Sequence, residues 1–578
     1  MKEQKSSAWY TRINKKKIGA LLLSACMFSS FVGCSVDSIK ESLNSSSNPF
    51  YQGSGETNGS LSDYETGNPV GGSSSGNVGD FETEDIINGT TSDKTTEDYE
   101  TETPNTGDAT ISTGKIEDYI GDEDESIYLQ TKLNDDPYRT QGGYSYFYHY
   151  QHGPTTMPIA AWTSPPPATK TSIGDFTTNQ ITLANYQTMA ESGINTIYAL
   201  YEKLHQKGVN QDVKNALKYA DQVGMVYYVA DGTVLGELGD PENDVDIEKT
   251  YGWYMNRKAY GGTLTKDEPG IGDHNKPFDS YRITQAKWRD SKYGQTKNMY
   301  VNNLPSYATD EQLYYHGTGL TIANPIPKSY TEENWGEFVK AYIQNVKPSV
   351  YSYDFYPFRG GAAAFKNYYF SLNAAREEAA KGNIPFWAFC QVGYFNVATE
   401  LNYQQMAIQV STALAYGAKG IQWFNYWHPL EFSANFTAGL VDHYGVKTKY
   451  YPIVQKINQH IAAVDDVLMQ CCNQGVLQIG ASYDTLYGLL KEDSYGAVTS
   501  TSGSSGSAIV GCFDYRESGK YAYYVSSNSY TEGATVNLTF DKAYNVYTIK
   551  GTEKSDVTNQ SSIKINVPAG DGVLVVVG

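Results

Sequence analysis

The middle of the chain alternates short apolar runs with stretches of helical periodicity. Each run is almost continuous in hydrophobic residues, which is typical of strands buried on both faces of a parallel sheet. Between the runs, apolar residues recur at helical spacing, as around Met189 and over 213–220. This alternation predicts an α/β fold, the (β/α)8 TIM barrel, whose strands would be 158–162, 194–200, 225–229, 261–270, 297–302, 349–354, 384–389 and 420–424.

The C-terminal part of the chain has a different pattern. After an amphipathic helix around Ile457, short segments alternate polar and apolar residues and are separated by Gly- and Ser-rich turns. The clearest of these segments are 521–525, 535–540 and 572–577. They predict a small C-terminal antiparallel β-sandwich, in which the Ser/Gly run 499–507 is expected to be a mobile loop. We therefore divide the folded part into a barrel at 127–470 and a β-sandwich at 471–578.

The N-terminal part of the chain is not predicted to fold. Residues 1–33 have a basic start and an apolar core, which is the composition of an export signal too short to span a bilayer comfortably. Residues 34–126 are rich in Ser, Gly, Thr, Asn and acidic residues and too poor in hydrophobic residues to bury a core, so we expect a disordered tether. The tether carries most of the net charge of −20, and the rest of the chain has no basic stripe that would indicate a nucleic-acid partner.

The cysteines and histidines indicate neither a disulfide framework nor a metal site. Cys390, Cys471, Cys472 and Cys512 lie beyond the tether without framework spacing, and the adjacent pair is expected to be reduced. The eight histidines show no ligand spacing that indicates zinc. We therefore predict no cofactor.

The fourth apolar run brings two carboxylates to the end of a predicted strand. It ends in Asp267 and Glu268, and Pro269 and Gly270 stop it at once. The chemistry of a TIM barrel lies at the carboxyl ends of its strands, so Glu268 is a candidate general acid/base. Asp354, at the end of the sixth run, supplies a further carboxylate on the same rim. Asp354 could instead orient other groups, and Asp267 could cap a turn.

The end of the export signal resembles the lipobox of bacterial lipoproteins. The resemblance rests on residues 31–35, Phe-Val-Gly-Cys-Ser, and on the polar tract that follows them. It implies that Cys34 becomes the lipidated first residue of the mature chain. The protein would then be extracytoplasmic and held to the bacterial membrane or cell surface through this lipid. The alternatives are an ordinary cleaved signal and an uncleaved anchor.

Three segments of the barrel look like bacterial glycoside hydrolases related to the family 42 β-galactosidases, a resemblance that covers roughly 155–578. They are Asp-Glu-Pro at 267–269, Ser-Tyr-Asp-Phe-Tyr-Pro at 352–357, and 413–421 together with Tyr426 and Trp427. In that clan of retaining barrels the acid/base is a glutamate at the end of strand four, which corresponds to Glu268. The nucleophile is a glutamate at the end of strand seven, where this chain has Gln391. The resemblance implies a glycoside hydrolase, and the departure leaves its second catalytic group open.

Three interpretations remain for a barrel with Gln391 at this place. Glycoside hydrolysis generally needs two carboxylates, about 5–5.5 Å apart for retention and about 6.5–9.5 Å for inversion, and Glu268 with Asp354 could form the wider pair. Alternatively, Asp267 and Glu268 resemble the adjacent pair of substrate-assisted N-acetylhexosaminidases, in which the aspartate steadies the acetamido group of the substrate. In the third, catalysis has been lost and the protein is a carbohydrate-binding surface lipoprotein with a decayed barrel.

Aromatic and polar residues gather at the predicted strand ends, where they are candidates for binding an oligo- or polysaccharide. Trp and Tyr prefer surroundings with one polar side, and their flat faces stack on sugar rings. Glu202 after the second strand could serve as a nucleophile or begin a solvated helix, and the asparagines after the fifth strand could form a turn. The substrate-binding candidates are Trp162, Glu202, Asn302, Asn303, Tyr356, Trp387, Gln391, Trp423, Asn425, Tyr426, Trp427 and His428.

Overall fold

The computed structural model describes residues 155–578 with short gaps. The predicted export signal 1–33, Cys34 and the tether 34–126 lie outside the described residues, as does the beginning of the region 127–470. The gaps are 172–173, 273–277, 295, 310–311, 314–331, 359–364, 383, 394–399, 430–438, 481–485 and 516–518.

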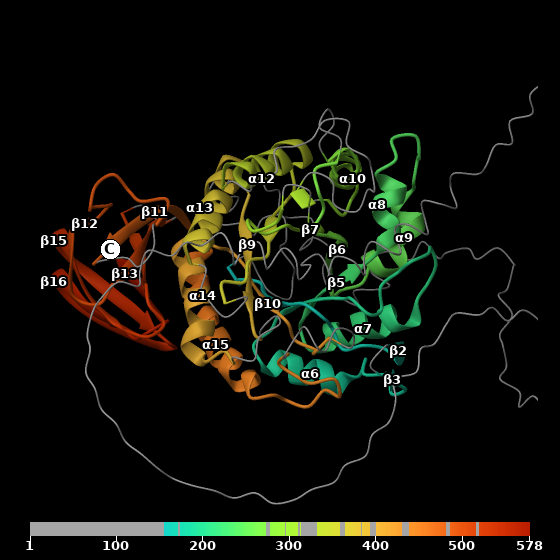
Figure 1. Cartoon of the computed structure of the whole chain (residues 1–578), viewed down its shortest axis with the longest axis horizontal. Helices are drawn as coiled ribbons and strands as arrows, with labels where there is room; N and C mark the ends of the chain where they lie inside the picture. The colour runs from blue at the N-terminus through green and yellow to red at the C-terminus, as the bar shows by residue number, and fades with distance from the viewer. Residues whose placement is uncertain are drawn as a thin grey trace, which may run out of the picture. The chain divides into compact units, whose positions relative to one another are not determined.

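Eight parallel strands close into a barrel, and each predicted apolar run forms one of them (Figure 1). The strands are β1 (Ile159–Ala161), β4 (Thr196–Tyr198), β5 (Val226–Ala230), β6 (Tyr260–Asp267), β7 (Asn298–Asn303), β8 (Tyr351–Tyr353), β9 (Phe386–Gln391) and β10 (Ile421–Phe424). They follow one another around the barrel in chain order, and β1 completes the ring by pairing with both β4 and β10. The predicted (β/α)8 TIM barrel is confirmed.

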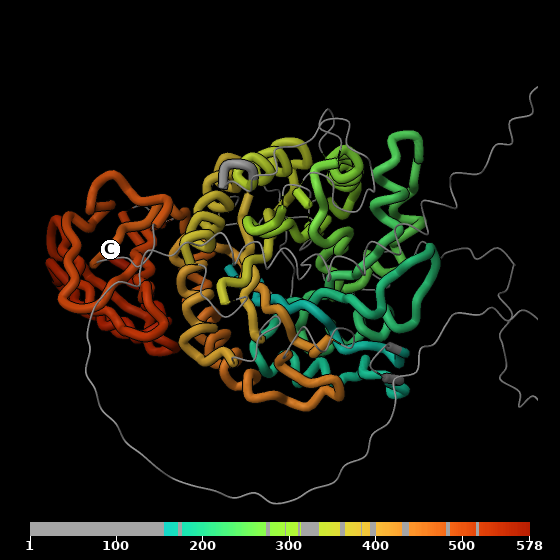
Figure 2. The backbone as a smooth tube through the Cα atoms, in the orientation of Figure 1, coloured from blue at the N-terminus to red at the C-terminus, as the bar shows by residue number. Residues whose placement is uncertain are grey.

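Helices connect the strands and surround the barrel, as the path of the backbone shows (Figure 2). The described helices are α6 (Leu183–Glu191), α7 (Gln211–Gln222), α8 (Gly232–Leu238), α9 (Ile247–Met255), α10 (Asp279–Asp290), α12 (Glu332–Val346), α13 (Phe365–Gly382), α14 (Tyr403–Ala415) and α15 (Tyr450–Leu468). A small hairpin of β2 (Thr169–Thr171) and β3 (Gly174–Phe176) lies between β1 and α6 in the chain. No helix in the described part is both long and apolar enough to cross a membrane.

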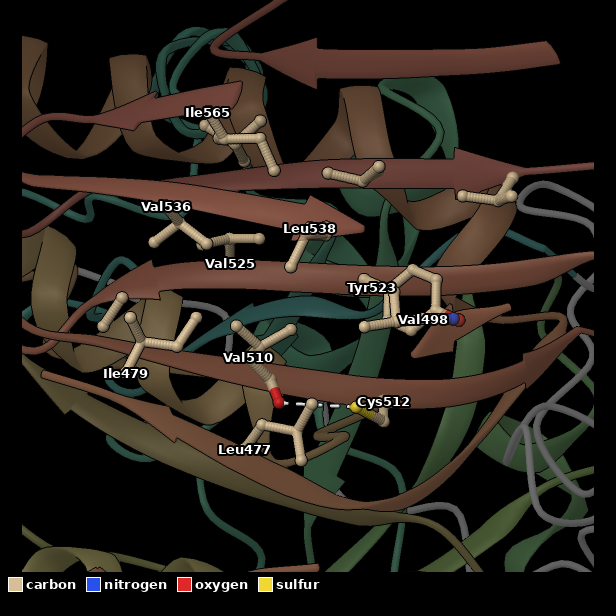
Figure 3. Packing of buried hydrophobic residues seen from close by; sticks show 14 of the residues in the cluster. Leu477, Ile479, Val498, Val510, Cys512, Tyr523, Val525, Val536, Leu538 and Ile565 are labelled. Atoms are coloured by element: carbon tan, nitrogen blue, oxygen red, sulfur yellow. Dashed lines mark hydrogen bonds between the residues drawn. The ribbon is translucent and has the colours of Figure 1, made fainter. Parts of the chain in front are cut away.

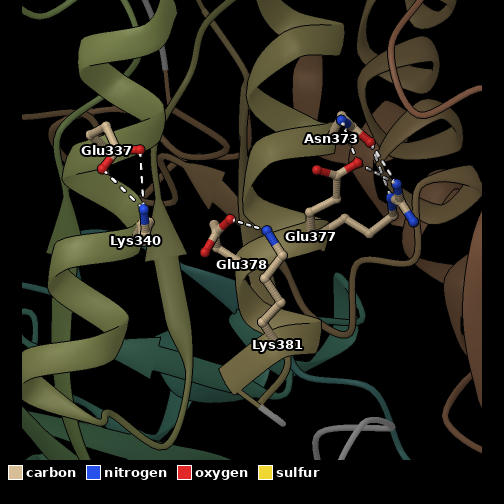
Figure 4. Close-up of polar contacts among 7 residues, drawn as sticks. Glu337, Lys340, Asn373, Glu377, Glu378 and Lys381 are labelled. Carbon is tan, nitrogen blue, oxygen red and sulfur yellow. Dashed lines mark hydrogen bonds and ion pairs between the residues drawn. The ribbon is translucent and has the colours of Figure 1, made fainter.

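Local sequence explains where the helices begin and what their outer faces present. Asn402 and Gln405 form a reciprocal capping box at the start of α14, which satisfies two backbone N–H groups that the helix leaves unpaired. On the outer faces of α12 and α13, ion pairs join residues three apart, such as Glu337 with Lys340 (Figure 4). Because such pairs are largely exposed to solvent, they contribute little to stability.

Aromatic side chains fill the interior of the barrel. Tyr198 stacks on Tyr300 with 4.6 Å between the ring centroids, and Tyr228 lies against both rings. A glycine at position 262 leaves room for this packing, because a Cβ there would lie 2.7 Å from the ring of Tyr228 and 2.3 Å from the carbonyl oxygen of Asn298. The closely packed rings lie beneath the carboxyl ends of the strands and hold those ends in fixed positions.

The C-terminal part is an antiparallel sheet, as predicted. Its strands are β11 (Cys471–Ile479), β12 (Val498–Ser505), β13 (Ala508–Tyr515), β14 (Tyr521–Ser527), β15 (Ala534–Lys550), β16 (Glu553–Val567) and β17 (Gly572–Val577). They pair in the order β11-β13-β14-β17-β15-β12, and β16 adds to β15. The sheet encloses one hydrophobic core, in which Val510, Tyr523 and Leu538 come from three different strands (Figure 3).

The structure shows how the Ser/Gly run and the cysteines are placed. The Ser/Gly run 499–507 was expected to be a mobile loop, and this is wrong for most of it, since β12 pairs with β15 from Val498 to Ser505. Ladder hydrogen bonds to a long neighbouring strand outweigh the low strand preference of Ser and Gly. The described cysteines, including Cys471 and Cys472, are buried and free of disulfides, as expected of reduced packing residues.

Candidate active site

Asp267 and Asp354 are joined through the side chain of Asn302. The parallel register sets Asp267 beside Asn302 of β7, and Asn302 beside Ser352 of β8, two residues before Asp354. The Nδ2 atom of Asn302 donates to Oδ1 of Asp267 at 3.0 Å and to Oδ1 of Asp354 at 3.2 Å. Because both oxygens bond to one nitrogen, they lie no more than about 6 Å apart. The structure thus brings two of the predicted catalytic carboxylates together.

Glu268 follows this pair directly at the end of β6. A register shift between Leu264 and Lys266 displaces the end of the strand, as β-bulges do at barrel rims. Glu268 is half-buried and has a φ of 46°, in the left-handed region that non-glycine residues seldom adopt. Its backbone N–H donates to the carbonyl oxygen of Asn302 at 2.8 Å, which helps to hold this conformation. Backbone strain of this kind clusters at functional sites.

Burial sets the protonation behaviour of Asp267. It raises the pKa of this carboxyl group, and the hydrogen bond from Asn302 and the positive charges of Lys266 and Lys203 oppose the rise only in part. Burial also lowers the pKa of the Lys203 ammonium group to about 8. A carboxyl group with a raised pKa at the mouth of a barrel is a candidate proton donor.

Tyr356 lies close to all three carboxylates. Burial raises the pKa of its hydroxyl group, and the charge of Asp354 is the next largest cause of the rise. The charges of Asp267 and Glu268 raise it further. Tyr356 therefore stays protonated within the electrostatic reach of Asp267, Glu268 and Asp354, which together form the carboxylate cluster. Its role in substrate binding stays a prediction.

Gln391 occupies the end of β9, where the family resemblance expects a nucleophile. Its side chain is fully buried and bonded to backbone at both ends. The Oε1 atom accepts from the N–H of Phe358 at 2.9 Å, and Nε2 donates to the carbonyl oxygen of Gly393 at 2.9 Å. The amide therefore joins the segment after β8 to the segment after β9, and it is not available to act on a substrate.

Glu202 is placed differently from either interpretation of the sequence. It is buried, so the expectation of a solvated helix start is wrong, and α7 begins only at Gln211. Its Oε1 accepts hydrogen bonds from Ser164 at 2.6 Å and from Tyr227, while Oε2 has no partner among the described residues. Burial raises the pKa of this carboxyl group. Burial raises the pKa of Tyr186 in α6, and the charge of Glu202 adds to the rise.

The predicted aromatic residues divide into core residues and binding candidates. Trp423 donates from Nε1 to Asn458 of α15 at 2.8 Å, and Trp387 packs against the tyrosines inside the barrel, so both serve the core. Tyr426 and Trp427 are also buried. Trp162 lies between the rings of Tyr198 and Phe389, and its Nε1 has no partner in the described part of the chain.

The polar candidates divide in the same way. Asn303 donates to the carbonyl oxygen of Ser352 at 2.9 Å and thereby fixes the backbone. Neither polar atom of the fully buried Asn425 side chain has a partner among the described residues. His428 is half-buried and stacks on His443 with 4.1 Å between ring centroids. Buried polar atoms normally find a partner, and Nε1 of Trp427 also has none among the described residues. The roles of Asn425, Trp162 and Trp427 in substrate binding stay predictions.

Sequence reasoning missed the polar side chains beneath the carboxylate cluster. Gln422 and Ser352 are fully buried inside the barrel, and the charge of Lys203 acts on Asp267. A glutamine within the apolar run 420–424 was the available signal, since a buried amide requires several partners. Among the described residues, no group of three or more His, Cys, Asp and Glu side chains is arranged to hold a metal ion.

No protein-family model and no curated protein matches this sequence. Among solved structures, the chain is similar to an α-amylase from Anoxybacillus, at 8% identity and a TM-score of 0.40, covering 76% of this chain and 98% of that one. It is also similar to a family 39 glycoside hydrolase from Bacteroides cellulosilyticus, at 11% identity and a TM-score of 0.36, covering 73% and 81%. A glucosidase from Croceicoccus marinus matches at 12% identity and a TM-score of 0.32, covering 73% and 95%. Likeness this distant assigns no activity.

Proposed function

We propose that the protein is a glycoside hydrolase that cleaves O-glycosidic bonds with carboxylates at the ends of β6 and β8. The observation that carries the proposal is the amide of Asn302, which holds the bonded oxygens of Asp267 and Asp354 no more than about 6 Å apart. This upper limit includes the narrower pair geometry of glycoside hydrolysis, in which the carboxyl groups lie about 5–5.5 Å apart. The substrate would be an oligo- or polysaccharide.

Asp267 is suited to donate a proton to the departing oxygen. Its raised pKa allows it to hold a proton closer to neutral pH, as a general acid requires. Asp354 would then act from the other side of the sugar, on the anomeric carbon or on a water molecule. Glu268, the acid/base predicted from the sequence, is the third carboxylate. It takes over the proton transfer if Asp267 instead steadies a 2-acetamido group of the substrate.

Three variants separate these roles, namely Asp267→Asn, Glu268→Gln and Asp354→Asn. The assay uses aryl glycosides of several sugars, including 2-acetamido sugars, with good and poor leaving groups. Loss of the general acid should lower kcat/KM by several orders of magnitude on poor leaving groups and spare kcat/KM for 2,4-dinitrophenyl glycosides, whose departure needs no proton. Loss of a nucleophile should lower turnover on every substrate, and added azide should restore it.

The matched control is Asp290→Asn, which removes an exposed carboxylate at the end of α10 and should leave turnover unchanged. Equal activity of all three site variants and the wild type would exclude the carboxylate cluster. The backbone bonds of Gln391 favour a second candidate, a carbohydrate-binding protein without catalysis. Retardation of the wild type in glycan-containing gels, with no release of reducing sugar from the same glycans, would establish that candidate instead.

We also propose that the enzyme acts outside the cell as a lipoprotein. The support is the sequence alone: the lipobox-like residues 31–35 and the acidic tether up to residue 126, which would keep the barrel away from the membrane. Lipidation of Cys34 would supply the anchor.

A further inference from the structure

A chain of buried hydrogen bonds crosses the interior of the barrel beneath the carboxylate cluster. The Oε1 atom of Gln422 accepts from the hydroxyl groups of Tyr198 and Tyr300, each at 2.6 Å. The Nε2 atom of Gln422 donates to Oγ of Ser352 at 2.9 Å. The Oγ atom of Ser352 donates to Oδ1 of Asn302 at 3.2 Å. These side chains come from β4, β7, β8 and β10, and the chain ends at the amide that holds Asp267 and Asp354.

The numbers of donors and acceptors on each side chain determine the direction of the hydrogen bonds in this buried series. Two tyrosine hydroxyl groups donate to one oxygen of Gln422, so its other atom facing Ser352 must be the nitrogen. Ser352 then accepts from Gln422 and has one proton to give. The Nδ2 atom of Asn302 donates to the two carboxylates, so the atom that faces Ser352 is Oδ1, which accepts the proton of Ser352. Tyr300 also lies 2.7 Å from Ser352. Because Ser352 gives its one proton to Asn302, this contact is a hydrogen bond only when Tyr300 is the donor, so the single proton of Tyr300 is shared between Ser352 and Gln422.

We propose that Gln422 and Ser352 are positioning residues of the active site, because they fix the amide of Asn302 with both N–H bonds toward Asp267 and Asp354. This inference rests on the proposed function for its catalytic consequence. Both residues are fully buried, so water does not compete for their hydrogen bonds. If the amide of Asn302 turned over, its oxygen would face two carboxylates. The network excludes that state and thereby maintains the spacing of the pair.

The charged and titratable groups around Asp267 determine how its pKa would change if the amide of Asn302 were held less firmly. Lys266 and Glu268 adjoin it on the chain, and Lys203 faces it from the segment after β4. The pKa values of Tyr300 of β7 and Tyr356 after β8 are raised by burial and, to a smaller extent, by the charge of Asp267. Of the contacts that lower its pKa, the hydrogen bond from Asn302 is the largest. Burial raises the pKa of Asp267 and the bond from Asn302 lowers it, so a weaker bond should let the pKa rise.

The test uses Ser352→Ala and Gln422→Met, with the aryl glycoside that the wild type cleaves fastest. We expect kcat to fall about tenfold to a hundredfold, as for small misplacements of catalytic groups, while KM stays the same. In the pH profile of kcat, the limb that follows the titration of Asp267 should move to higher pH. A general loss of packing would not produce this movement. Ser352→Thr keeps the hydroxyl group and should restore both quantities.

Two tyrosines inside the barrel provide a matched pair of controls. Tyr198→Phe removes a donor to Gln422 and should have a smaller effect of the same kind, since Tyr300 still bonds to Gln422. Tyr228→Phe removes a hydroxyl group outside the network, which accepts from Nδ2 of Asn298 at 3.4 Å, and should leave the pH profile in place. Equal effects of the two phenylalanine variants, or loss of kcat without movement of the limb in Ser352→Ala, would overturn the inference.

A measurement without substrate separates this inference from the proposed function. The pH dependence of the melting temperature, compared between the full-length protein and Asp267→Asn, reports the titration of Asp267. In Ser352→Ala that titration should move to higher pH even if no glycoside is cleaved. An unmoved titration would overturn the positioning role, whereas inactivity of the wild type on every glycan would overturn only the proposed function.

Discussion

Replacing Gln391 with glutamate places a carboxyl group where the family resemblance expects a nucleophile. The family resemblance alone favours restored activity in this variant, and the structure predicts the opposite. The introduced group could still accept from the N–H of Phe358, but it could no longer donate to the carbonyl oxygen of Gly393 when ionised. A buried carbonyl oxygen would lose its partner and face a negative charge, so we expect lower stability at neutral pH and no gain in turnover.

The magnitude follows from the contacts that are lost. An unsatisfied buried polar group costs about 1–3 kcal/mol, and the adjacent charge adds to this, so a deficit of about 2–3 kcal/mol is expected near pH 7.5. A protonated carboxyl group can donate to Gly393, which raises its folded pKa above the unfolded value of about 4.3. The variant should therefore match the wild type below about pH 4 and lose stability as the pH rises through the folded pKa.

Thermal unfolding between pH 4 and pH 8 measures this difference. At pH 7.5 the melting temperature of Gln391→Glu should lie roughly 2–4 °C below that of the wild type, and the gap should close toward low pH. The matched control is Gln187→Glu, an exposed glutamine within α6, which should show little change at any pH. A variant as stable as the wild type at pH 7.5, with turnover raised by the new carboxylate, would refute the structural role assigned to Gln391.

Three further predictions concern other parts of the chain. Burial raises the pKa of Glu202 in the folded state, so the wild type loses stability as the pH rises through that pKa; Glu202→Gln should not, and its melting temperature relative to the wild type should increase from pH 4 to pH 8. Cys34→Ser should release the protein from membranes into the medium if the lipid is its anchor, and continued membrane fractionation would argue against lipidation. Deleting residues 35–126 should change the melting temperature by less than about 2 °C, because a disordered acidic segment buries little surface, and a larger drop would mean that it packs on the barrel.

The barrel could be predicted because its strands are local features of the sequence. Each apolar run is complete within a few residues, and helical spacing separates one run from the next. The run 499–507 could not be assigned in this way, since its pairing with β15 involves residues far along the chain. Strand pairing at such separation depends on the neighbour rather than on the residues themselves.

The residue types of the site and their positions at strand ends could be predicted, but not their hydrogen-bond partners. Asp267, Glu268 and Asp354 were found because they end strands. The bridge through Asn302 depends on a register shift in β6, and the binding of Gln391 depends on Phe358 from another segment. Whether Glu202 meets solvent is decided by Ser164 and Tyr227 around it. Such contacts arise only when separate strands are brought together.

The tyrosines inside the barrel give the protein an optical signal of its own folding. Burial raises the pKa values of Tyr198 and Tyr300 well above their ordinary value. In alkaline solution these rings should remain phenols while exposed tyrosines become phenolates, which absorb at longer ultraviolet wavelengths. Absorbance should therefore rise first for the exposed rings, and again in a late step when the barrel opens. Ultraviolet titration would follow the integrity of the barrel without any added dye or label.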